Sequence, residues 1–440
     1  MKRARDLAVP SMKPLPQRRA VTVTVLDVGS SKVCCIIARL KPRDGAEVLR
    51  GRSHTIEVIG FGHYRARGVK SGVVTDLDEA ERSIRHAVDQ AERMAGLTVD
   101  SLIVTVSAGR LASETYSASV ALDGHAVENS DIARVLAAGK DHALADGRLT
   151  VHALPIGYAI DAEHGIQDPR GMIGDMLGVD MHVVTADGSP LRNLERCLNR
   201  CHLEVEAMVA APYASGLSAL VSDEAQLGTV LVDMGAGTTT IGAFIDGEFV
   251  HVDAIALGGQ HVTMDLARGL SMRLEDAERF KTLHGSALPG PSDDRDVITV
   301  PPVSDHDGDA PNHIPRSALT KVIRPRAEEI LELVRDRLAS GGLTGMAQKR
   351  LVLTGGASQL SGLSELSRRI VSRNVRLGRP LGVSGLPEAA RGAAFSAAVG
   401  LLIYPQMLRV EPVSVRRPRI SGRLAGGYFA RMGQWLRESL

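Results

Sequence analysis

The stretch LVDMGAGTTTIGAF, residues 231–244, places an aspartate at the end of an apolar run and follows it with glycines and threonines. A second, imperfect version, VLDVGSSKVCCIIA, occupies residues 25–38. In both, an Asp-x-Gly turn separates two runs of apolar and β-branched residues, which predicts a strand, a tight turn and a second strand. Because small residues let a ligand approach the backbone amides, each turn could hold a phosphate group.

Repetition of this turn is more informative than either copy. Taken alone, DVGSSK at 27–32 is more readily explained as a structural hairpin. Two such turns followed by a third glycine turn, LTGGAS at 353–358, form an order that resembles the actin, Hsp70 and sugar-kinase ATPases. The resemblance implies an α/β protein with a duplicated actin-like ATPase fold, in which two lobes enclose a nucleotide cleft and each hairpin grips the polyphosphate from one side.

The same resemblance implies roles for individual residues. Those expected to bind ATP are Gly29, Ser30, Ser31 and Lys32 in the first turn, Gly235, Ala236, Gly237, Thr238 and Thr239 in the second, and Gly355, Gly356 and Ala357 beside the adenosine. Asp27 and Asp233 could reach Mg2+ through water, since that ion prefers oxygen ligands. Glu278 and Lys281 match residues that contact the ribose or base in relatives, although an ordinary surface ion pair on one helix face explains them equally.

Size and charge limit the classes of function. At 440 residues and 46.8 kDa, the chain is expected to form two or more lobes. Residues 1–20 carry six basic side chains and one acidic, residues 411–440 carry six and two, and the rest carries 40 and 48. An acidic body with basic ends argues against nucleic acid as a partner and suits an anionic membrane surface. The four cysteines form no CxxC pair, so reduced thiols are expected.

Longer phrases narrow the family. RGVKSGVVTDLDEAERSIRHAVDQAERMAG, HALPIGYAIDAEHGIQDPRGM, ERFKTLHGSAL, VIRPRAEEILELV and AAVGLLIY resemble the FtsA family of bacterial cell-division proteins, and the resemblance covers about residues 21–405. It implies an actin-like, ATP-binding protein that polymerises on the membrane, tethers FtsZ filaments to it and helps to recruit later division proteins. The implied location is peripheral, on the cytoplasmic face of the inner membrane at the division septum.

The domain boundaries are expected from the resemblance and from composition. They are 1–19 for a disordered basic extension; 20–98, 181–206 and 391–408 for subdomain 1A; 99–180 for an inserted subdomain 1C; 207–258 and 326–390 for subdomain 2A; 259–325 for subdomain 2B; 409–426 for a flexible basic linker; and 427–440 for an amphipathic helix. A closing helix is expected at 388–403, at the end of the folded part.

The last fourteen residues, GYFARMGQWLRESL, have the pattern of an interfacial helix. Their apolar residues recur on one helical stripe, and the expected membrane contacts are Tyr428, Phe429, Met432, Trp435, Leu436 and Leu440. Arginines precede the stripe within a linker that contains Pro and Gly. This arrangement favours a reversible membrane anchor, and the alternative is a last helix packed on the protein's own core.

Hydrolysis of ATP is expected to be weak or absent, and no catalytic residue is assigned. Relatives that hydrolyse ATP carry Glu or Gln where this chain has Ala210 and Ala211, and the nearest acid, Glu206, falls several residues too early. Without a group that orients water, general-base help worth about 10²–10⁴ in rate is lost.

Partners follow from the resemblance as well. The C-terminal peptide of FtsZ is expected to dock on subdomain 2B at Arg326 and Glu329, because a basic side chain suits an acidic peptide; a merely solvated helix face is the alternative. Other copies of the chain would form filaments, and later division proteins would bind subdomain 1C. Two rival classes remain open at this point: a pilus-assembly protein of the PilM type, and a true enzyme such as a sugar kinase or exopolyphosphatase.

Overall fold

The structure is a computed structural model and describes residues 12, 14–16, 18–43, 52–140, 147–161, 163–301 and 312–407. Two five-stranded sheets organise these residues. The order is β11-β6-β1-β2-β3 in the first sheet and β14-β13-β12-β17-β18 in the second. In each sheet three antiparallel strands are extended by two parallel ones. The expected α/β class is confirmed, and the duplication is visible as one topology used twice.

The first lobe consists of the first sheet and its covering helices. Its strands are β1 (Val21–Val28), β2 (Lys32–Pro42), β3 (His54–Arg65), β6 (Ser101–Val106) and β11 (Glu204–Ala210), with a short hairpin of β4 (Val69–Lys70) and β5 (Val73–Val74). Its helices are α1 (Leu77–Ala95), α3 (Gly188–Arg200) and α11 (Ser396–Ile403). Helix α1 begins where Asp76 caps it, accepting hydrogen bonds from two backbone amides, and ends at Gly96 in the left-handed conformation, as cap chemistry favours.

The second lobe is built around the second sheet. Its strands are β12 (Thr229–Met234), β13 (Thr239–Ile245), β14 (Glu248–Ile255), β17 (Leu351–Thr354) and β18 (Val375–Leu377). The helices beside it are α4 (Ala211–Ala219), α5 (Ser222–Leu227), α8 (Arg316–Ser340), α9 (Thr344–Lys349) and α10 (Leu363–Ile370). Short 3-10 turns occur at Gly356–Gln359, Glu388–Ala390, Ala393–Phe395 and Tyr404–Gln406.

An end unit extends the second lobe. It contains α6 (Gly259–Gly269), α7 (Leu274–His284), β15 (Val297–Val300), β16 (Asn312–Pro315) and the start of α8, which enclose a small core of their own. Because α8 is 25 residues long, one helix carries this unit and packs on the second sheet as well.

The insertion is a four-stranded sheet, ordered β7-β10-β8-β9, with one helix. Its elements are β7 (Ala112–Ala121), α2 (Asn129–Lys140), β8 (Arg148–Ile160), β9 (Glu163–Ile166) and β10 (Met176–Asp187). The strand pairing places the edges of the insertion at other residues than the expected 99 and 180. Strand β6 pairs in parallel with β1 and β11 and so lies in the first sheet, whereas β10 stays paired with β7 and β8 as far as residues 185–187.

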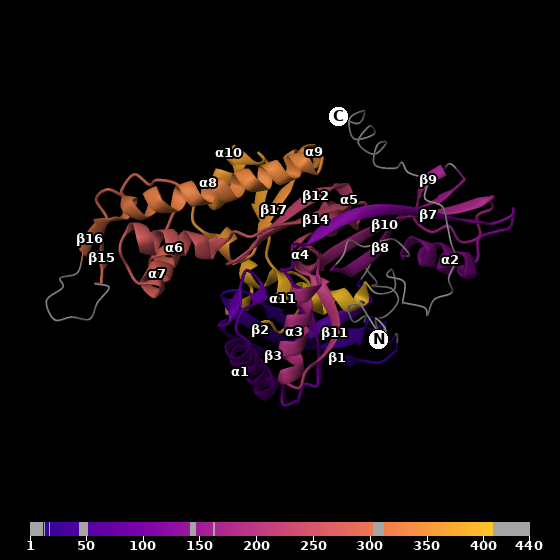
Figure 1. The fold of residues 1–440 in the computed structure, drawn as a ribbon, viewed down its shortest axis with the longest axis horizontal. Helices are drawn as coiled ribbons and strands as arrows, with labels where there is room; N and C mark the ends of the chain where they lie inside the picture. Colours follow the sequence, from indigo (N-terminus) through magenta and orange to yellow (C-terminus); the bar gives the residue numbers. More distant parts are fainter. Residues whose placement is uncertain are drawn as a thin grey trace.

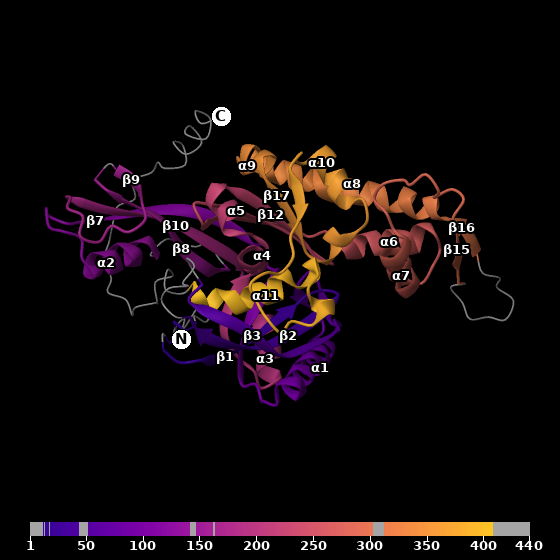
Figure 2. The same cartoon turned by 180° about the vertical axis from the view of Figure 1, so that it is seen from behind.

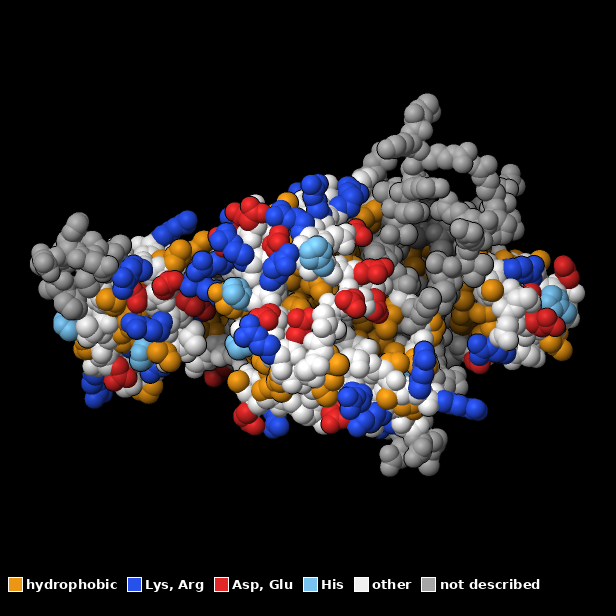
Figure 3. Space-filling model, turned by 90° about the horizontal axis from the view of Figure 1, so that it is seen from below, with side chains coloured by type: hydrophobic (Ala, Val, Ile, Leu, Met, Phe, Trp, Pro, Cys, Tyr) orange, Lys and Arg blue, Asp and Glu red, His pale blue; other side chains and the backbone are white. Residues whose placement is uncertain are grey.

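The units lie in a row in both ribbon views. The insertion lies at one end of the long axis and the end unit with α6 and α7 at the other, while the two sheets share the centre (Figure 1 and Figure 2). Helices α4 and α11 lie between the two sheets in the same views. Acidic and basic side chains are interspersed over the face seen in Figure 3.

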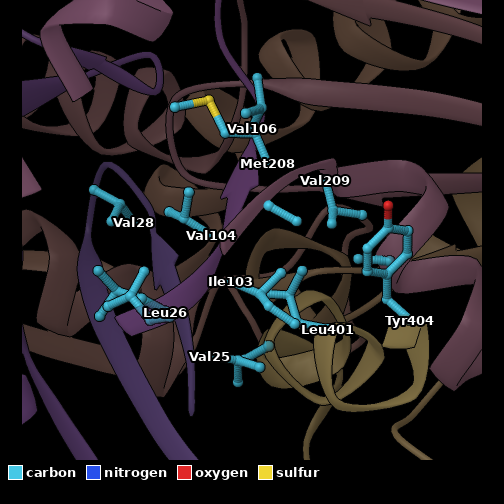
Figure 4. Packing of buried hydrophobic residues seen from close by; sticks show 14 of the residues in the cluster. Val25, Leu26, Val28, Ile103, Val104, Val106, Met208, Val209, Leu401 and Tyr404 are labelled. Carbon is cyan, nitrogen blue, oxygen red and sulfur yellow. The ribbon is translucent and has the colours of Figure 1, made fainter. Parts of the chain in front are cut away.

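The largest core belongs to the first lobe. Figure 4 shows apolar side chains of β1, β6 and β11 meeting Leu401 of α11 and Tyr404 just after it. Strand β6 is buried from Leu102 to Val106, because helices or the insertion cover both faces of the sheet. The same core takes in Phe244 and Phe249 from the second sheet, so apolar packing joins the two lobes beneath their hairpins.

The structure describes only part of the two chain ends for which the sequence predicts an extension, a linker and an amphipathic helix. Leu15 is buried in the first core, and the carbonyl oxygen of Pro16 accepts a hydrogen bond from His54 Nε2 at 3.1 Å. The end of the expected disordered extension therefore packs on the fold. The linker and the amphipathic helix lie outside the described residues, which contain no helix long and apolar enough to cross a membrane.

Candidate functional site

The two glycine hairpins have the same local geometry. Strand β1 carries Asp27 and turns at Gly29, whose amide donates to the carbonyl oxygen of Lys32 at 3.0 Å. Strand β12 carries Asp233 and turns at Gly235, whose amide donates to the carbonyl oxygen of Thr238 at 2.9 Å. Each aspartate therefore stands two residues before its turn, on the central strand of its sheet.

Sequence-distant residues bring the two hairpins into contact. A Cβ atom on Gly237 would lie 2.5 Å from Ser30 Oγ and 2.8 Å from the Cα of Ser71. Ser30 Oγ in turn accepts a hydrogen bond from the amide of Gly72 at 3.1 Å. The expected first and second phosphate turns thus meet across the lobes, and the absence of a side chain at Gly237 lets them do so.

Asp27 is held by two neighbours. Thr105 Oγ1, on the adjacent strand β6, donates to Asp27 Oδ1 at 2.7 Å. Lys32 Nζ lies 3.7 Å from Asp27 Oδ2, donates to the carbonyl oxygen of Ala394 and stands 4.8 Å above the centre of the Phe395 ring. The lysine side chain is only 23% exposed, and these contacts hold its positive charge beside the first turn, where a phosphate would need a cation.

Asp233 occupies the matching place in the second lobe. Its Oδ2 accepts a hydrogen bond from Ser215 Oγ of α4. Burial raises the pKa of Asp233 to about 6; the Ser215 hydrogen bond and Lys32 oppose the shift, and the negative charge of Asp27 adds to it. The directly opposed residue on β13 is Thr240, whose buried Oγ1 has no hydrogen-bond partner among the described residues. An unsatisfied hydroxyl cross-strand from a buried carboxylate fits a site that takes a polar ligand or water.

The third glycine turn closes on the same aspartate. Gly355 has φ 84° and ψ 164°, a conformation that is essentially restricted to glycine. A Cβ atom there would lie 2.3 Å from Asp233 Oδ1 and 2.5 Å from the carbonyl oxygen of Met234. Gly356 and Ala357 continue into a 3-10 turn. The three turns expected from the sequence are therefore brought together around Asp233.

Glu278 and Lys281 join the site from α7. Lys281 Nζ donates to Glu278 Oε2 at 2.6 Å, to Thr263 Oγ1 at 2.8 Å and to the carbonyl oxygen of Gly259 at 3.1 Å. A Cβ atom on Gly259 would lie 3.0 Å from the Cβ of Ala357. Lys281 therefore does more than form a surface ion pair with Glu278, because it also joins α7 to the start of α6 beside the third turn.

These groups are chemically suited to a magnesium nucleotide. The turns offer backbone amides, Lys32 offers a cation, and two carboxylates face the same region. Among the described residues no three His, Cys, Asp or Glu side chains gather as a metal site. Mg2+ usually keeps several waters and substrate phosphates among its ligands, so one or two protein carboxylates are enough to hold it.

The residues at the expected water-orienting positions are alanines. Ala210 and Ala211 are buried at the junction of β11 and α4, and the amide of Ala210 donates to His152 Nε2 at 3.0 Å. Glu206 is hydrogen-bonded to Ser101. Ser101 precedes Thr105, the partner of Asp27, by four residues on β6, which corresponds to about 13 Å along the strand.

Arg326 and Glu329 do lie together on α8. Arg326 Nε donates to Asp265 Oδ2 of α6 at 2.6 Å and Nη2 to Asp265 Oδ1 at 3.3 Å, and Nη1 also donates to Glu329. The guanidinium group therefore already links α8 to α6. All six expected membrane contacts, Tyr428, Phe429, Met432, Trp435, Leu436 and Leu440, lie outside the described residues.

Comparison with known proteins identifies the family. A family model for cell division protein FtsA matches residues 230–400, and one for the SHS2 domain inserted in FtsA matches residues 108–185. Cell division protein FtsA of Rhizobium meliloti (strain 1021) is 57% identical, over 99% of this chain and 98% of that protein. The chain belongs to the FtsA family. FtsA of Escherichia coli (strain K12) is 30% identical over 94% and 97% of the two chains.

Solved structures support the fold of this FtsA-family chain. The PilM-PilN type IV pilus biogenesis complex matches with a TM-score of 0.59 at 15% identity, covering 90% of this chain and all of that one. MreB5 of Spiroplasma citri bound to ADP matches with a TM-score of 0.52 at 12% identity, covering 90% and 98%. The family and the actin-like fold expected from the sequence are confirmed, and the PilM likeness is one of fold.

Sequence reasoning missed several residues that build the site. Thr105 and Ser215 hold the two aspartates, Gly259 approaches the third turn, and Ser71 with Gly72 supports Ser30. None carries a local motif, because each acts through a contact between distant segments. The Ser71-Gly72 turn, with φ of 47° and 73°, could have been flagged from its Lys-Ser-Gly sequence as a turn.

Proposed function

We propose that this FtsA-family cell-division protein binds ATP with Mg2+ between its two glycine hairpins. The observation that carries the proposal is the meeting of three glycine turns at one place, with Asp233 against Gly355 and Gly237 against Ser30. Lys32 and the turn amides would hold the phosphates, Asp27 and Asp233 would hold Mg2+ through water, and Ala357 would lie beside the adenosine. The ADP-bound MreB5 relative of similar fold supports a nucleotide as the ligand.

ATP would act mainly as a structural ligand. It would favour the closed arrangement of the lobes, because a ligand that contacts both lobes stabilises the state in which they meet. Turnover would be slow, since Glu206 is tied to Ser101 and alanines occupy the positions of the water-orienting group. A closed chain would then assemble into filaments with other copies.

Calorimetry with ATP and Mg2+ tests the site directly. The wild type should release or absorb heat with a single site per chain, and Asp233→Asn should bind Mg2+·ATP more weakly while keeping affinity for ATP without the metal. Asp246→Asn, on the turn after β13 and away from the three glycine turns, is a matched control. A folded wild type that gives no heat with ATP and Mg2+ would refute the proposal.

We further propose that the chain acts on the cytoplasmic face of the inner membrane at the division septum. There residues 427–440 would form an amphipathic helix that anchors the chain to the membrane, and the chain would tether FtsZ filaments to it. Burying five large apolar side chains of that helix contributes roughly 8–15 kcal/mol gross, which ordering of the helix and lost freedom reduce. One copy should bind reversibly, and a filament tightly through avidity. Later division proteins would bind the insertion.

Liposome co-sedimentation tests the tether. Wild type should pellet with anionic vesicles more strongly when ATP is present, and Trp435→Glu should remain in the supernatant. Equal pelleting of the two forms would show that another part of the chain binds lipid.

The FtsZ peptide is proposed to dock beside Arg326 and Glu329. Since the guanidinium group of Arg326 already donates two hydrogen bonds to Asp265, an acidic peptide would have to share that guanidinium group with Asp265 or displace the Asp265 carboxylate. Arg326→Ala should therefore weaken binding of a labelled FtsZ C-terminal peptide. Arg324→Ala, which removes a half-buried ion pair with Glu328 on the same helix, is the control. An equal loss of peptide binding in both variants would show that the peptide responds to the overall charge of the helix and not to a defined site.

A further inference from the structure

One ion pair spans the two lobes at their outer surface. Arg65 Nη1 lies 2.7 Å from Glu275 Oε1, and the two side chains are 63% and 75% exposed. Arg65 is the last residue of β3 in the first sheet, and Glu275 lies in the first turn of α7 in the end unit. The hydrogen bond from Arg65 lowers the pKa of the Glu275 carboxyl, so the pair is charged at neutral pH.

The first partner is attached to the first phosphate turn. Arg65 is the cross-strand neighbour of Lys32 on β2. The amide of the next residue, Ala66, donates to the carbonyl oxygen of Ser31 at 3.0 Å. A displacement of Arg65 is therefore transmitted through the backbone to the residues proposed to hold the phosphates.

The second partner is attached to the proposed adenosine side. Glu275 lies one helical turn before Glu278, so both stand on one side of α7. Glu278 accepts from Lys281, which also donates to the carbonyl oxygen of Gly259, the residue beside Ala357. The Arg65–Glu275 pair thus joins the phosphate side of the site to its adenosine side through solvent-exposed atoms.

We propose that Arg65 and Glu275 form a latch across the mouth of the nucleotide site and set how fast bound nucleotide leaves. The inference rests on the proposed binding of ATP between the hairpins. The buried apolar core beneath the hairpins holds the lobes together on the inner side, whereas the ion pair holds them at the outer side. Opening the pair lets α7 move away from the first turn, and closing it encloses the nucleotide.

The strength of the latch suits an exchangeable ligand. An ion pair this exposed contributes modestly to the closed state, because water and salt screen it. Its loss should accelerate nucleotide release by about two- to fivefold. Release from the wild type should itself accelerate as salt rises, and the variants without the pair should lose most of that dependence.

Stopped-flow release of a fluorescent ATP analogue from the full chain is the test, chased with excess ATP and Mg2+. Arg65→Ala and Glu275→Ala should each release the analogue about two- to fivefold faster, and the double variant should be no faster than either alone. Arg65→Glu should exceed both, and Arg65→Glu combined with Glu275→Arg should return toward the wild-type rate. Arg93→Ala is the matched control, because it removes an exposed pair with Asp89 that lies within α1.

The outcomes separate the latch from the nucleotide site itself. A wild type that binds no analogue would refute the proposed function, whereas binding with equal release from all variants would refute the latch alone. A faster release from Arg65→Ala but not from Glu275→Ala, without rescue by the charge swap, would show that Arg65 acts on the nucleotide directly, and would also overturn the latch.

Discussion

A single methyl group at Gly237 should separate ATP affinity from the stability of the fold. Gly237 does not adopt the left-handed backbone conformation, so alanine is locally acceptable in its own hairpin. The new Cβ atom would, however, lie 2.5 Å from Ser30 Oγ, 2.8 Å from the Cα of Ser71 and 2.9 Å from its nitrogen. Non-bonded carbon atoms prefer about 3.5–4.0 Å, so the two hairpins must move apart by roughly 1 Å.

This displacement sets the size of the expected effect. Overpacking by a methyl group typically costs about 1–3 kcal/mol, which corresponds to roughly 5- to 150-fold in an equilibrium constant. Because the contact lies between lobes, the penalty falls on closure around the nucleotide and leaves each core intact. Calorimetry of Gly237→Ala with ATP and Mg2+ should show that loss, while urea unfolding should change by less than about 1 kcal/mol.

Two controls make the result decisive. Gly157→Ala adds a methyl group where no atom of the described residues, apart from the two chain neighbours, lies within 4 Å, and it should leave ATP affinity unchanged. Adding Ser30→Ala to Gly237→Ala should restore affinity only in part, because the Ser71 backbone still lies in the way. Wild-type affinity in Gly237→Ala, with the fold intact, would refute the contact between the hairpins as a feature of the bound state.

Three further changes test the fold. Arg376→Met removes the guanidinium that binds the buried carboxylate of Glu224 and should lower the free energy of unfolding in urea by about 2–4 kcal/mol, whereas replacing both residues by methionine should cost less. Asp76→Ala removes two hydrogen bonds that cap α1 and should cost about 1 kcal/mol, seen as a lower Tm that Asp76→Asn largely restores. Burial lowers the pKa of His182 to about 3, whereas the same imidazole in the unfolded chain has a pKa of about 6.5. Between these two pH values the unfolded chain binds one more proton than the folded chain, so the free energy of unfolding should fall as the pH drops from about 6.5 toward 3. His182→Leu removes this group and should show a flatter pH profile of the urea midpoint.

Local pattern was sufficient for the two hairpins and the third glycine turn. A strand, an aspartate and a small-residue turn are all specified within a few neighbouring residues, so each turn could be predicted locally. That Asp27, Asp233 and Gly355 share one site was predicted from the family resemblance. The family resemblance then supplied their order in an actin-like fold. The comparisons confirm that fold and that family.

Other features could not be predicted from the sequence, because they depend on contacts between distant segments. The expected closing helix at 388–403 is split into two 3-10 turns and α11, since Gly392 is extended with ψ 161°. The short apolar run of β6 does not show by itself which sheet it joins, and its parallel pairing with β1 places it in the first sheet. Arg65 and Glu275, 210 residues apart, carry no shared signal in the sequence.

By itself the sequence determined which groups each turn carries, because the glycines, hydroxyls and aspartates stand next to one another in the chain. It also determined the family, through phrases spread along the chain. Only the tertiary structure decided which groups hold those aspartates, that Gly237 stands against Ser30, and that α7 is joined to β3 across the site. Those facts depend on the packing of two sheets against each other, and distances between sheets are set by the whole core and not by neighbouring residues.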